Sequence, residues 1–372
     1  MLASAKRICQ ITTVHPRYDV RIFNKICLSL VSDYQVNLIV ADGRGDEVIN
    51  NVTIFDVGRG NSSRIKRMLF TTRSAYRKAM ELDCEVFHFH DPEFLFFGYK
   101  LTRKGKYVIY DAHEDLPRQI FGKHYIKTFL KPVISKTVEI FENFISKYFY
   151  AIVTATPKIK DRFSRINSRT VAVCNYVITE EFLPNINYSE RAKKICYIGG
   201  ISKVRGINEL MSSLDFIDPD FTLELAGEIE DLRLESELLS NKNWGRVRYY
   251  GFVGRNEIKL ILKSSRIGIL TLYPIPNHLD SLPIKLFEYM AAGIPVIASD
   301  FPLWREIVEG NNCGICVNPK DPEDISNAIN YLLMNQDVAE TMGKNGVKAA
   351  SDKFNWDSEK EKLLTLYSSL FQ

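Results

Sequence analysis

DSLPIKLFEYMAAGIPVIASD, residues 280–300, is the stretch on which the interpretation of the whole chain depends. Its first half has helical periodicity. The residues of its apolar face are Leu286, Phe287, Met290 and Ala291. Gly293 ends the helix and Pro295 cannot extend it. The run 296–298, Val-Ile-Ala, is short, apolar and β-branched, which is typical of a buried parallel strand.

Two carboxylates accompany this helix. Glu288 lies on it, and Asp280 precedes it by a few residues. The amides and the positive dipole end of a helix N-terminus suit a phosphate. A carboxylate beside them suits a ribose diol, because it can accept two hydroxyl hydrogens. A capped helix that packs on a sheet would use the same residues, so both interpretations stay open at this point.

The stretch resembles the donor-binding signature of retaining glycosyltransferases of family 4. That signature has an acidic residue, seven others, a Glu, a small-residue turn and a Pro-Val strand. Glu288 matches the second Glu, and Asp280 stands where a Glu is usual. The resemblance extends over most of the chain and implies the GT-B fold, two Rossmann-like doubly wound domains that face an inter-domain cleft. It also implies retaining transfer from a nucleotide diphosphate sugar, without metal or another cofactor.

Strands alternate with helices in both halves of the 372 residues, which indicates parallel sheets in two domains. The expected parts are an N-terminal acceptor-binding domain (1–175), a polar linker (176–192), a nucleotide-sugar-binding domain (193–355) and a final helix (356–372). That helix resembles the segment that crosses back to the N-terminal domain in this fold. A long helix is also expected over Ser63–Glu81, and another from about Tyr125 to Lys147.

The expected diphosphate site is YIGGISKVRG, residues 197–206. Gly199 and Gly200 allow a ligand to approach the backbone, and Lys203 and Arg205 can neutralise phosphate charge. In the family a Gly-Arg pair followed by Lys-Gly holds the diphosphate. Arg205 matches that Lys, but Gly200 replaces the Arg, so Lys203 or Lys285 must supply a second cation. The resemblance further assigns the donor sugar to Asp280, Ser281, Leu282, Pro283 and Ile284, and the ribose to Glu288.

HFHDPE (88–93) and YDAHED (110–115) each follow a predicted strand, at the sheet edge where open α/β folds bind ligands. His113 matches the family's His beside the donor sugar. His90, Asp91, His15 and Arg17 are expected on the acceptor side. Arg17 and Arg21 in the loop HPRYDVR (15–21) suit phosphate binding and ion pairs within the loop equally well.

Two other functions are compatible with these residues. His88, His90, Asp91 and His113 have the chemistry of a divalent-metal site, as in HxH hydrolases. Those hydrolases place the pair on the first strand of a closed barrel, whereas here it falls inside an open half. The other function is a catalytically silent nucleotide-sugar-binding protein, because Asp280 and Gly200 depart from the family pattern.

Charge is unevenly distributed along the chain. Residues 1–186 contain 28 Lys and Arg and 19 Asp and Glu, a net +9, and the rest has 21 and 26, a net −5. The stretch 62–79 contains no acid, and it reads as a basic amphipathic helix that binds anionic lipid or as a solvated face. Its cations are Arg64, Lys66, Arg67, Arg73, Arg77 and Lys78, and its apolar residues are Met68, Leu69 and Phe70. No nucleic-acid-binding module is recognisable.

The expected location is the cytoplasm, peripheral on the inner face of the cell membrane. No apolar run approaches the roughly 20 residues of a membrane span, and no secretory signal is evident. The seven cysteines lack framework spacing, which indicates reduced thiols. The expected partners are a nucleotide sugar donor, a lipid-linked or growing surface polysaccharide as acceptor, and an anionic membrane surface, without nucleic acid.

Overall fold

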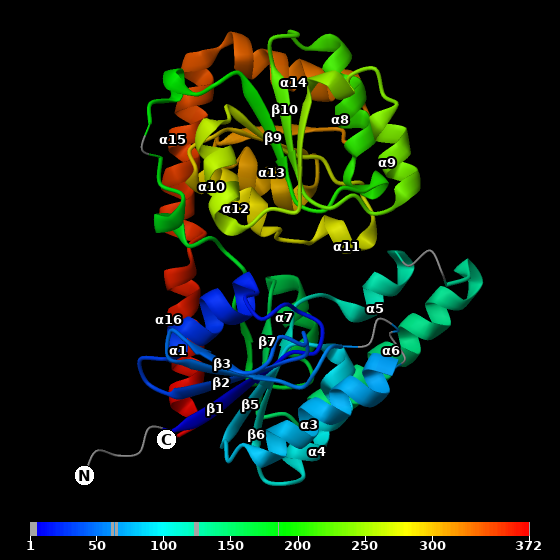
Figure 1. Ribbon diagram of the computed structural model, residues 1–372, viewed down its shortest axis with the longest axis vertical. Coiled ribbons are helices and arrows are strands. Elements are labelled where there is room, and N and C mark those ends of the chain that lie inside the picture. The colour runs from blue at the N-terminus through cyan, green and yellow to red at the C-terminus, as the bar shows by residue number, and fades with distance from the viewer. Residues whose placement is uncertain (1–5, 61–62, 64–65, 123–125, 185, 372) are drawn as a thin grey trace. The chain divides into compact units, whose positions relative to one another are not determined.

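The computed structural model describes residues 6–60, 63, 66–122, 126–184 and 186–371. The chain forms two compact units (Figure 1). Unit 1 comprises Met1–Asn175 and Asp357–Gln372, and unit 2 comprises Tyr176–Trp356. Each unit is an α/β fold around one mainly or wholly parallel sheet.

Unit 1 has an eight-stranded sheet in the order β3-β4-β2-β1-β5-β6-β7-β8. The strands are β1 (Arg7–Ile11), β2 (Gln35–Val40), β3 (Glu47–Ile49), β4 (Val52–Asp56), β5 (Val86–Phe89), β6 (Tyr107–Ala112), β7 (Ala151–Thr154) and β8 (Thr170–Ala172). All pairs are parallel except β3–β4. The chain proceeds from β1 toward one edge and from β5 toward the other. A doubly wound sheet binds ligands at such a reversal, which here lies between β1 and β5.

Helices connect these strands. They are a π-helix (Val20–Cys27) continued by α1 (Leu28–Leu30), a π-helical turn η2 (Arg67–Thr71) continued by α3 (Thr72–Glu81), α4 (Leu95–Thr102), α5 (Leu116–Gln119), α6 (Lys131–Ser146) and α7 (Pro157–Phe163). Short 3₁₀ turns cover Pro92–Phe94, Ile120–Gly122 and Thr128–Leu130. Helix α4 contacts both α3 and α6, and the three form one layer of the unit (Figure 1).

The C-terminal helix α16 (Trp356–Ser369) packs on unit 1 through buried polar contacts. Gln10 Nε2 donates to Tyr367 Oη at 2.8 Å, and the same hydroxyl lies 2.9 Å from His88 Nδ1. At the other end of α16, Glu359 accepts a hydrogen bond from the backbone N–H of Cys174 at 2.9 Å. A buried donor without a partner is destabilising, so α16 completes the polar interior that β1 and β5 begin.

Replacement of Tyr367 by Phe should therefore loosen α16. Gln10 and His88 would both lose their buried partner, at a cost of about 1–3 kcal/mol in the free energy of opening this helix. Hydrogen exchange of the α16 amides would measure this change in the free energy of opening. Tyr150→Phe is the matched control, because Tyr150 also donates to this helix, at Ser369 O (2.9 Å), but at an exposed site. Equal effects of the two substitutions would contradict the role of burial.

Unit 2 has a six-stranded sheet in the order β11-β10-β9-β12-β13-β14, parallel throughout. The strands are β9 (Lys194–Ile198), β10 (Thr222–Ala226), β11 (Val247–Gly251), β12 (Ile267–Leu270), β13 (Val296–Ser299) and β14 (Gly314–Val317). The order reverses between β9 and β12, which places the expected ligand-binding edge at their carboxyl ends.

The helices of unit 2 are α8 (Ile207–Ser213), α9 (Leu232–Leu239), α10 (Arg255–Ser264), α11 (Pro276–Leu279), α12 (Ile284–Ala291), α13 (Pro302–Val308), α14 (Pro322–Met334) and α15 (Gln336–Lys353). Helix α12 is the helix of the 280–300 stretch, and every residue from Lys285 to Ala291 is buried. The amphipathic pattern underestimates this burial, because α15 covers the side of α12 that faces away from the sheet. Two charged side chains, Lys285 and Glu288, are consequently inside the unit.

Other elements differ from the sequence-based prediction. Segment 176–192, predicted as a linker, packs on unit 2, because Val177, Phe182 and Tyr188 bury their side chains in its core clusters. Strands β3 and β8 were missed because each has only three residues. The predicted helix from Ser63 is observed over Arg67–Glu81, and Arg64 lies outside the described residues, as does Tyr125 at the start of the other predicted helix.

Candidate functional site

The glycine turn after β9 lies against two cations. Gly199 has φ +113°, and a methyl group there would lie 2.5 Å from Lys285 Nζ and 3.7 Å from Arg205 Nη1. Only glycine adopts this backbone readily, and only its lack of a Cβ leaves room for the ammonium. Gly206 has φ +68°, and a methyl group on it would overlap the carbonyl oxygen of Thr271. The two glycines thus allow the turn to pack closely against β12 and α12.

Lys285 is the unusual residue of this turn. Its side chain is buried, and no described residue accepts a hydrogen bond from Nζ. Its nearest favourable contact is the ring of Tyr197, 4.8 Å from Nζ to the ring centroid. Burial, followed by repulsion from Arg205, lowers the pKa of Lys285 to about 7. A buried ammonium that lacks an acceptor and lies beside a guanidinium is suited to bind an anion.

Further polar groups surround the same turn. The buried hydroxyl of Thr271, at the end of β12, also has no partner among the described residues. Ser281, Leu282, Pro283 and Ile284 are half-buried at the start of α12. The amide of Leu286 donates to the carbonyl of Pro283, whereas the amides of Ile284 and Lys285, at the first two helical positions, have no intrahelical acceptor. Asp280 is exposed at the end of α11. The structure therefore brings the predicted donor residues of Gly199, Arg205 and α12 to one end of unit 2.

Glu288 is not free to contact a ribose with its whole carboxylate. Its Oε1 forms an ion pair with Arg255 at 2.5 Å, and Arg255 in turn binds Glu181 at 2.6 Å. Neither the pairing nor Arg255 was foreseen, because the two residues are 33 positions apart. Arg255 holds the carboxylate in the buried end of α12, and its own Nη2 has no partner among the described residues.

Lys203 does not join the cation pair. Its Nζ lies 2.9 Å from Glu237 on α9, and about half of its side chain is exposed. The prediction named Lys203 or Lys285 as the second cation beside Arg205, and the structure places Lys285 there. The reason is geometric, since the 3₁₀ turn Lys203–Arg205 directs Arg205 toward Gly199 and Gly200 while Lys203 pairs with α9.

The uncompensated charge of Lys285 should destabilise unit 2. Because its folded-state pKa is lowered, the folded protein binds fewer protons than the unfolded chain between about pH 7 and about 10.5. Stability should therefore rise with pH across that window. Lys285→Met should increase the unfolding free energy at pH 6–7 by on the order of a few kcal/mol and flatten the pH dependence.

Urea denaturation followed by tryptophan fluorescence would test this, since all three Trp residues are in unit 2. Lys203→Met is the control, because that cation is exposed and paired. A Lys285→Met protein that is less stable than the parent below pH 7 would show that the ammonium has a stabilising partner.

In unit 1, a buried carboxylate organises the ligand-binding edge. Asp111, at the end of β6, is fully buried and receives two hydrogen bonds from Arg21, at 2.7 and 2.9 Å. Its Oδ2 also contacts His113 Nε2 at 3.0 Å and His90 Nδ1 at 3.2 Å. Burial opposes ionisation of Asp111, but the charges of Arg21 and His113 hold its pKa well below the usual range. The predicted residues His90 and His113 are thus adjacent.

His15 and Asp91 lie at the same edge. His15 Nε2 is 3.5 Å from Asp91, its Nδ1 is 3.6 Å from Asp19, and its ring lies 5.2 Å from that of His113. Burial lowers the pKa of His15, but the two carboxylates outweigh burial and raise it above its ordinary value. Asp91 accepts a hydrogen bond from the N–H of Thr13 at 2.5 Å. His15 is one-third exposed, so this group is accessible to solvent.

The two arginines of the first loop are structural. Arg17 is buried and pairs with Asp42 and Glu47, at 2.6 and 2.5 Å. Arg21 binds Asp111 and the carbonyl of Val173. The sequence left open both phosphate binding and ion pairs for these arginines, and the structure shows ion pairs within unit 1. Arg17 is therefore corrected from an acceptor-side residue to an anchor of the loop between β2 and β3.

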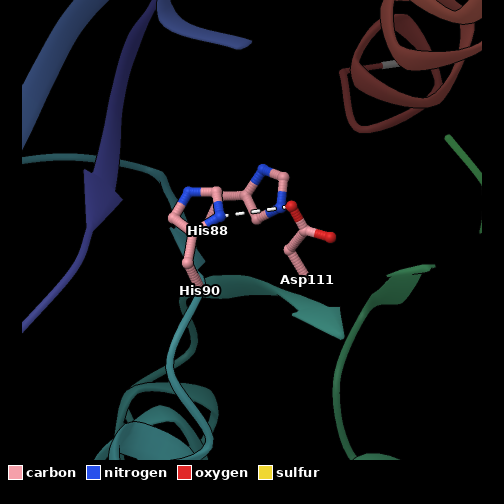
Figure 2. A group of neighbouring side chains, drawn as sticks. All are labelled: His88, His90 and Asp111. Atoms are coloured by element: carbon pink, nitrogen blue, oxygen red, sulfur yellow. Dashed lines mark hydrogen bonds and ion pairs between the residues drawn. The ribbon is translucent and has the colours of Figure 1, made fainter. Parts of the chain in front are cut away.

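One group in unit 1 has the composition of a metal site. Figure 2 shows His88, His90 and Asp111, whose ligand atoms lie within 4.8 Å of one another. The group differs from the predicted one, because Asp111 takes the place of Asp91 and His113 is not part of it. Arg21 already binds both oxygens of Asp111, so a divalent ion would compete with a cation in place. His88 Nδ1 is already engaged by Tyr367 Oη at 2.9 Å, a hydroxyl that also accepts from Gln10.

The sequence comparisons identify unit 2. Residues 179–349 match the family model of "Glycosyl transferases group 1". An uncharacterized glycosyltransferase of Methanocaldococcus jannaschii is 23% identical over 253 residues, which cover 63% of each chain. This chain thus spans less than two thirds of the length of that curated relative.

Solved structures extend the similarity to nearly the whole chain. Sucrose-phosphate synthase from Thermosynechococcus elongatus has a TM-score of 0.77 at 16% identity, with 98% of this chain and 99% of that chain covered. Anabaena HepE in complex with UDP-glucose has a TM-score of 0.75 at 14% identity and covers 98% of this chain and 99% of its own. The predicted GT-B fold, with two Rossmann-like units, is confirmed.

Several contributors to the two edges were missed by sequence reasoning. Thr271 follows an apolar strand as a lone polar residue, which is a weak signal. Asp111 stands in the quoted YDAHED motif but was not singled out, and its distance in sequence from Arg21 hides the pair. No helix in the described residues is long and apolar enough to cross a membrane.

Proposed function

We propose that the chain is a retaining glycosyltransferase. It transfers a sugar from a nucleotide diphosphate sugar, with UDP or GDP as the nucleotide, to a hydroxyl group of a lipid-linked or growing surface polysaccharide. The enzyme works at the inner face of the cell membrane and needs neither metal nor cofactor. The match of residues 179–349 to the model of glycosyl transferases group 1 supports sugar transfer, and HepE, a fold relative, was solved in complex with UDP-glucose.

The observation that supports the donor site is the unpaired ammonium of Lys285. Burial of a charge without a partner is costly, and a ligand that supplies the missing acceptor recovers that cost on binding. A diphosphate fits, because Lys285 and Arg205 flank Gly199 from two directions and offer donors of different shapes. This pair replaces the Arg-Lys pair of the family, with Lys285 on α12 in place of the residue lost at Gly200.

The remaining donor contacts follow from the same end of unit 2. First-turn amides of α12 and the hydroxyl of Thr271 supply neutral donors, and Asp280 accepts from a sugar hydroxyl. Glu288 binds the ribose through Oε2 while Arg255 keeps Oε1. In the transfer step, negative charge develops on the leaving diphosphate, and Lys285, Arg205 and the helix amides stabilise it in place of Mg²⁺.

In unit 1, His113 is the residue assigned to the reacting sugar. Asp111 holds Nε2 of His113, so Nδ1 is the nitrogen available to a ligand. His15, His90 and Asp91 shape the acceptor side of this edge. The leaving phosphate oxygen takes the proton of the acceptor hydroxyl, which is consistent with retention of the anomeric configuration.

Nucleotide titration tests the donor site without knowledge of the sugar. UDP and GDP, compared with uridine and guanosine, separate phosphate binding from base and ribose binding. Arg205→Gln and Lys285→Met should each weaken the diphosphate at least tenfold and leave nucleoside binding nearly unchanged, since only the diphosphate is charged. Lys203→Gln is the matched control and should bind as the parent does. Isothermal calorimetry gives all affinities.

The pH dependence of diphosphate affinity gives a second, independent test of the donor site. Because free Lys285 loses its proton above about pH 7, diphosphate binding at higher pH must take up a proton. Affinity should fall by up to about tenfold per pH unit above 7 in the parent, and less steeply in Lys285→Met. Equal losses of diphosphate and nucleoside, or identical pH profiles in parent and variant, would remove Lys285 from the site.

A metal-dependent hydrolase is the second candidate, because His88, His90 and Asp111 do form a cluster of metal-binding residues. The proposed enzyme should contain no stoichiometric metal by elemental analysis, and excess chelator should leave its melting temperature and its UDP affinity unchanged. Melting at a lower temperature after chelation, restored by one divalent ion, would favour the hydrolase. His88→Gln is the informative variant there, since it removes a ligand of the cluster to which the proposed transferase assigns no role.

A further inference from the structure

Helix α6 presents an apolar surface to solvent. Val133, Ile140, Phe141, Phe144 and Tyr148 are 43–64% exposed. Their spacing places them on one side of a helix, one or two turns apart. Phe129, just before the helix, is 72% exposed. Single exposed apolar residues are ordinary, but a continuous stripe of large ones indicates a contact surface. We call these five residues the α6 face.

The fully exposed charged residues around the α6 face are lysines. Between Lys131 and Tyr148, all of it described, the exposed residues other than the apolar ones are Pro132, Lys136, Thr137 and Lys147. No acid is among them. Glu139 is only partly exposed and pairs with Lys136, and Glu142 is fully buried. Lys147 lies over the rings of Phe144 and Tyr148, at 4.4 and 5.2 Å from the ring centroids.

The orientation of α6 is fixed by its opposite side. Glu142 accepts hydrogen bonds from Tyr110 Oη at 2.9 Å and from Arg162 at 2.8 Å. Ile145 packs in the core cluster of unit 1, and Ser135 donates to the carbonyl of Pro117. With these residues turned inward, the helix cannot rotate to bury its apolar stripe in unit 1. The stripe therefore faces away from the core of unit 1.

The same layer offers further apolar and basic groups. Helix α4 contacts α6 (Figure 1). It exposes Phe96, and the Nζ of Lys100 lies 4.6 Å from the centroid of that ring. The turn η2 exposes Met68, Leu69 and Phe70. Unit 1 as a whole has 30 Lys and Arg against 20 Asp and Glu, a net +10, whereas unit 2 has 19 against 25, a net −6.

We propose that the α6 face docks on an anionic lipid bilayer and inserts its side chains at the level of the headgroups. The inference rests on the membrane location in the proposed function and names the surface responsible. A stripe of aromatic and β-branched residues bordered by lysines, without exposed acids, matches helices that lie in the membrane interface. Lysine stems can follow the apolar surface while the ammonium reaches lipid phosphate. A second copy of this chain would instead have to bury the like charges of two such faces.

This assignment changes how much the basic stretch 62–79 is expected to contribute to membrane binding. Arg67, one of its cations, is held by Glu93 in a two-bonded pair at 2.7 and 2.8 Å and is only partly exposed. Lys66, Arg73 and Arg77 remain exposed and add long-range attraction. Attraction of that kind disappears in high salt, whereas insertion of the α6 face does not. Membrane binding should therefore have a salt-sensitive part and a salt-resistant part.

Vesicle co-sedimentation of the full chain tests the proposal. The probe is phosphatidylcholine vesicles with about 30% phosphatidylglycerol, compared with pure phosphatidylcholine. The parent should bind the anionic vesicles and retain measurable binding at about 1 M salt, where the Debye length is about 3 Å. Ile140→Gln/Phe141→Gln should lower the partition coefficient at least tenfold and abolish the salt-resistant part. Leu232→Gln/Leu239→Gln, on exposed positions of α9, is the matched control and should bind as the parent does.

A fluorescence experiment reports insertion directly. The three native Trp residues are in unit 2, so Phe141→Trp places the sole indole of unit 1 on the α6 face. Its emission should shift to the blue on anionic vesicles and be quenched by brominated lipid. Absence of quenching, or equal sedimentation of both double variants, would overturn the proposal. So would light scattering that shows a dimer in the parent and a monomer in Ile140→Gln/Phe141→Gln.

UDP titration of the same proteins separates this inference from the proposed donor site. Both double variants should bind UDP and melt as the parent does, since their substitutions are exposed and remote in sequence from Arg205 and Lys285. Loss of vesicle binding with normal UDP binding supports the α6 face. Normal vesicle binding in a parent that fails to bind UDP or GDP would refute the donor site alone.

Discussion

The arrangement of unit 1 depends on the ion pair between Asp111 and Arg21. Both groups are almost completely buried, and the pair joins the end of β6 to the π-helix after β1. Arg21 extends the link to the backbone after β8, and Asp111 extends it to His90 and His113. A buried pair of this kind is stable only when its remaining donors and acceptors are satisfied, which is why the surrounding polar residues are specific. The ligand-binding edge of unit 1 is built around that requirement.

Unit 2 shows the opposite arrangement. Its buried cation, Lys285, has no counter-charge within hydrogen-bonding distance among the described residues, although Glu288 lies one helical turn away and is held by Arg255. The ion pair with Arg255 engages Oε1 of Glu288, and the attraction of Glu288 only partly offsets the burial of Lys285. The free-energy cost of burying the Lys285 charge therefore lies where an anionic ligand can offset it. In unit 1 the buried charges of Asp111 and Arg21 are paired, whereas in unit 2 the buried charge of Lys285 has no partner among the described residues.

Local sequence patterns predicted the parallel sheets, the course of most strands and the position of both ligand-binding edges, because strand ends and glycine turns have strong local signals. In the structure Arg205 lies beside Lys285, and His90 lies beside His113. Sequence patterns failed to predict the structure where contacts between distant parts of the chain determine it. Full burial of α12 depends on α15, and the pairing of Glu288 with Arg255 depends on how α10 packs. The roles of Arg17 and Lys203 were decided by acids on β3 and α9, elements that are short or unrecognised in the sequence.

The placement of α16 in unit 1 has a consequence for how the protein is made. The chain leaves unit 1 at Asn175, builds all of unit 2 as one continuous segment, and returns only at Asp357. During synthesis, Gln10 and His88 therefore lack their tyrosine partner until Tyr367 has left the ribosome. Unit 2, although second in sequence, is the first that can reach its complete native structure, because domains generally fold as units when all of their residues are available. Unit 1 therefore completes its native structure after unit 2.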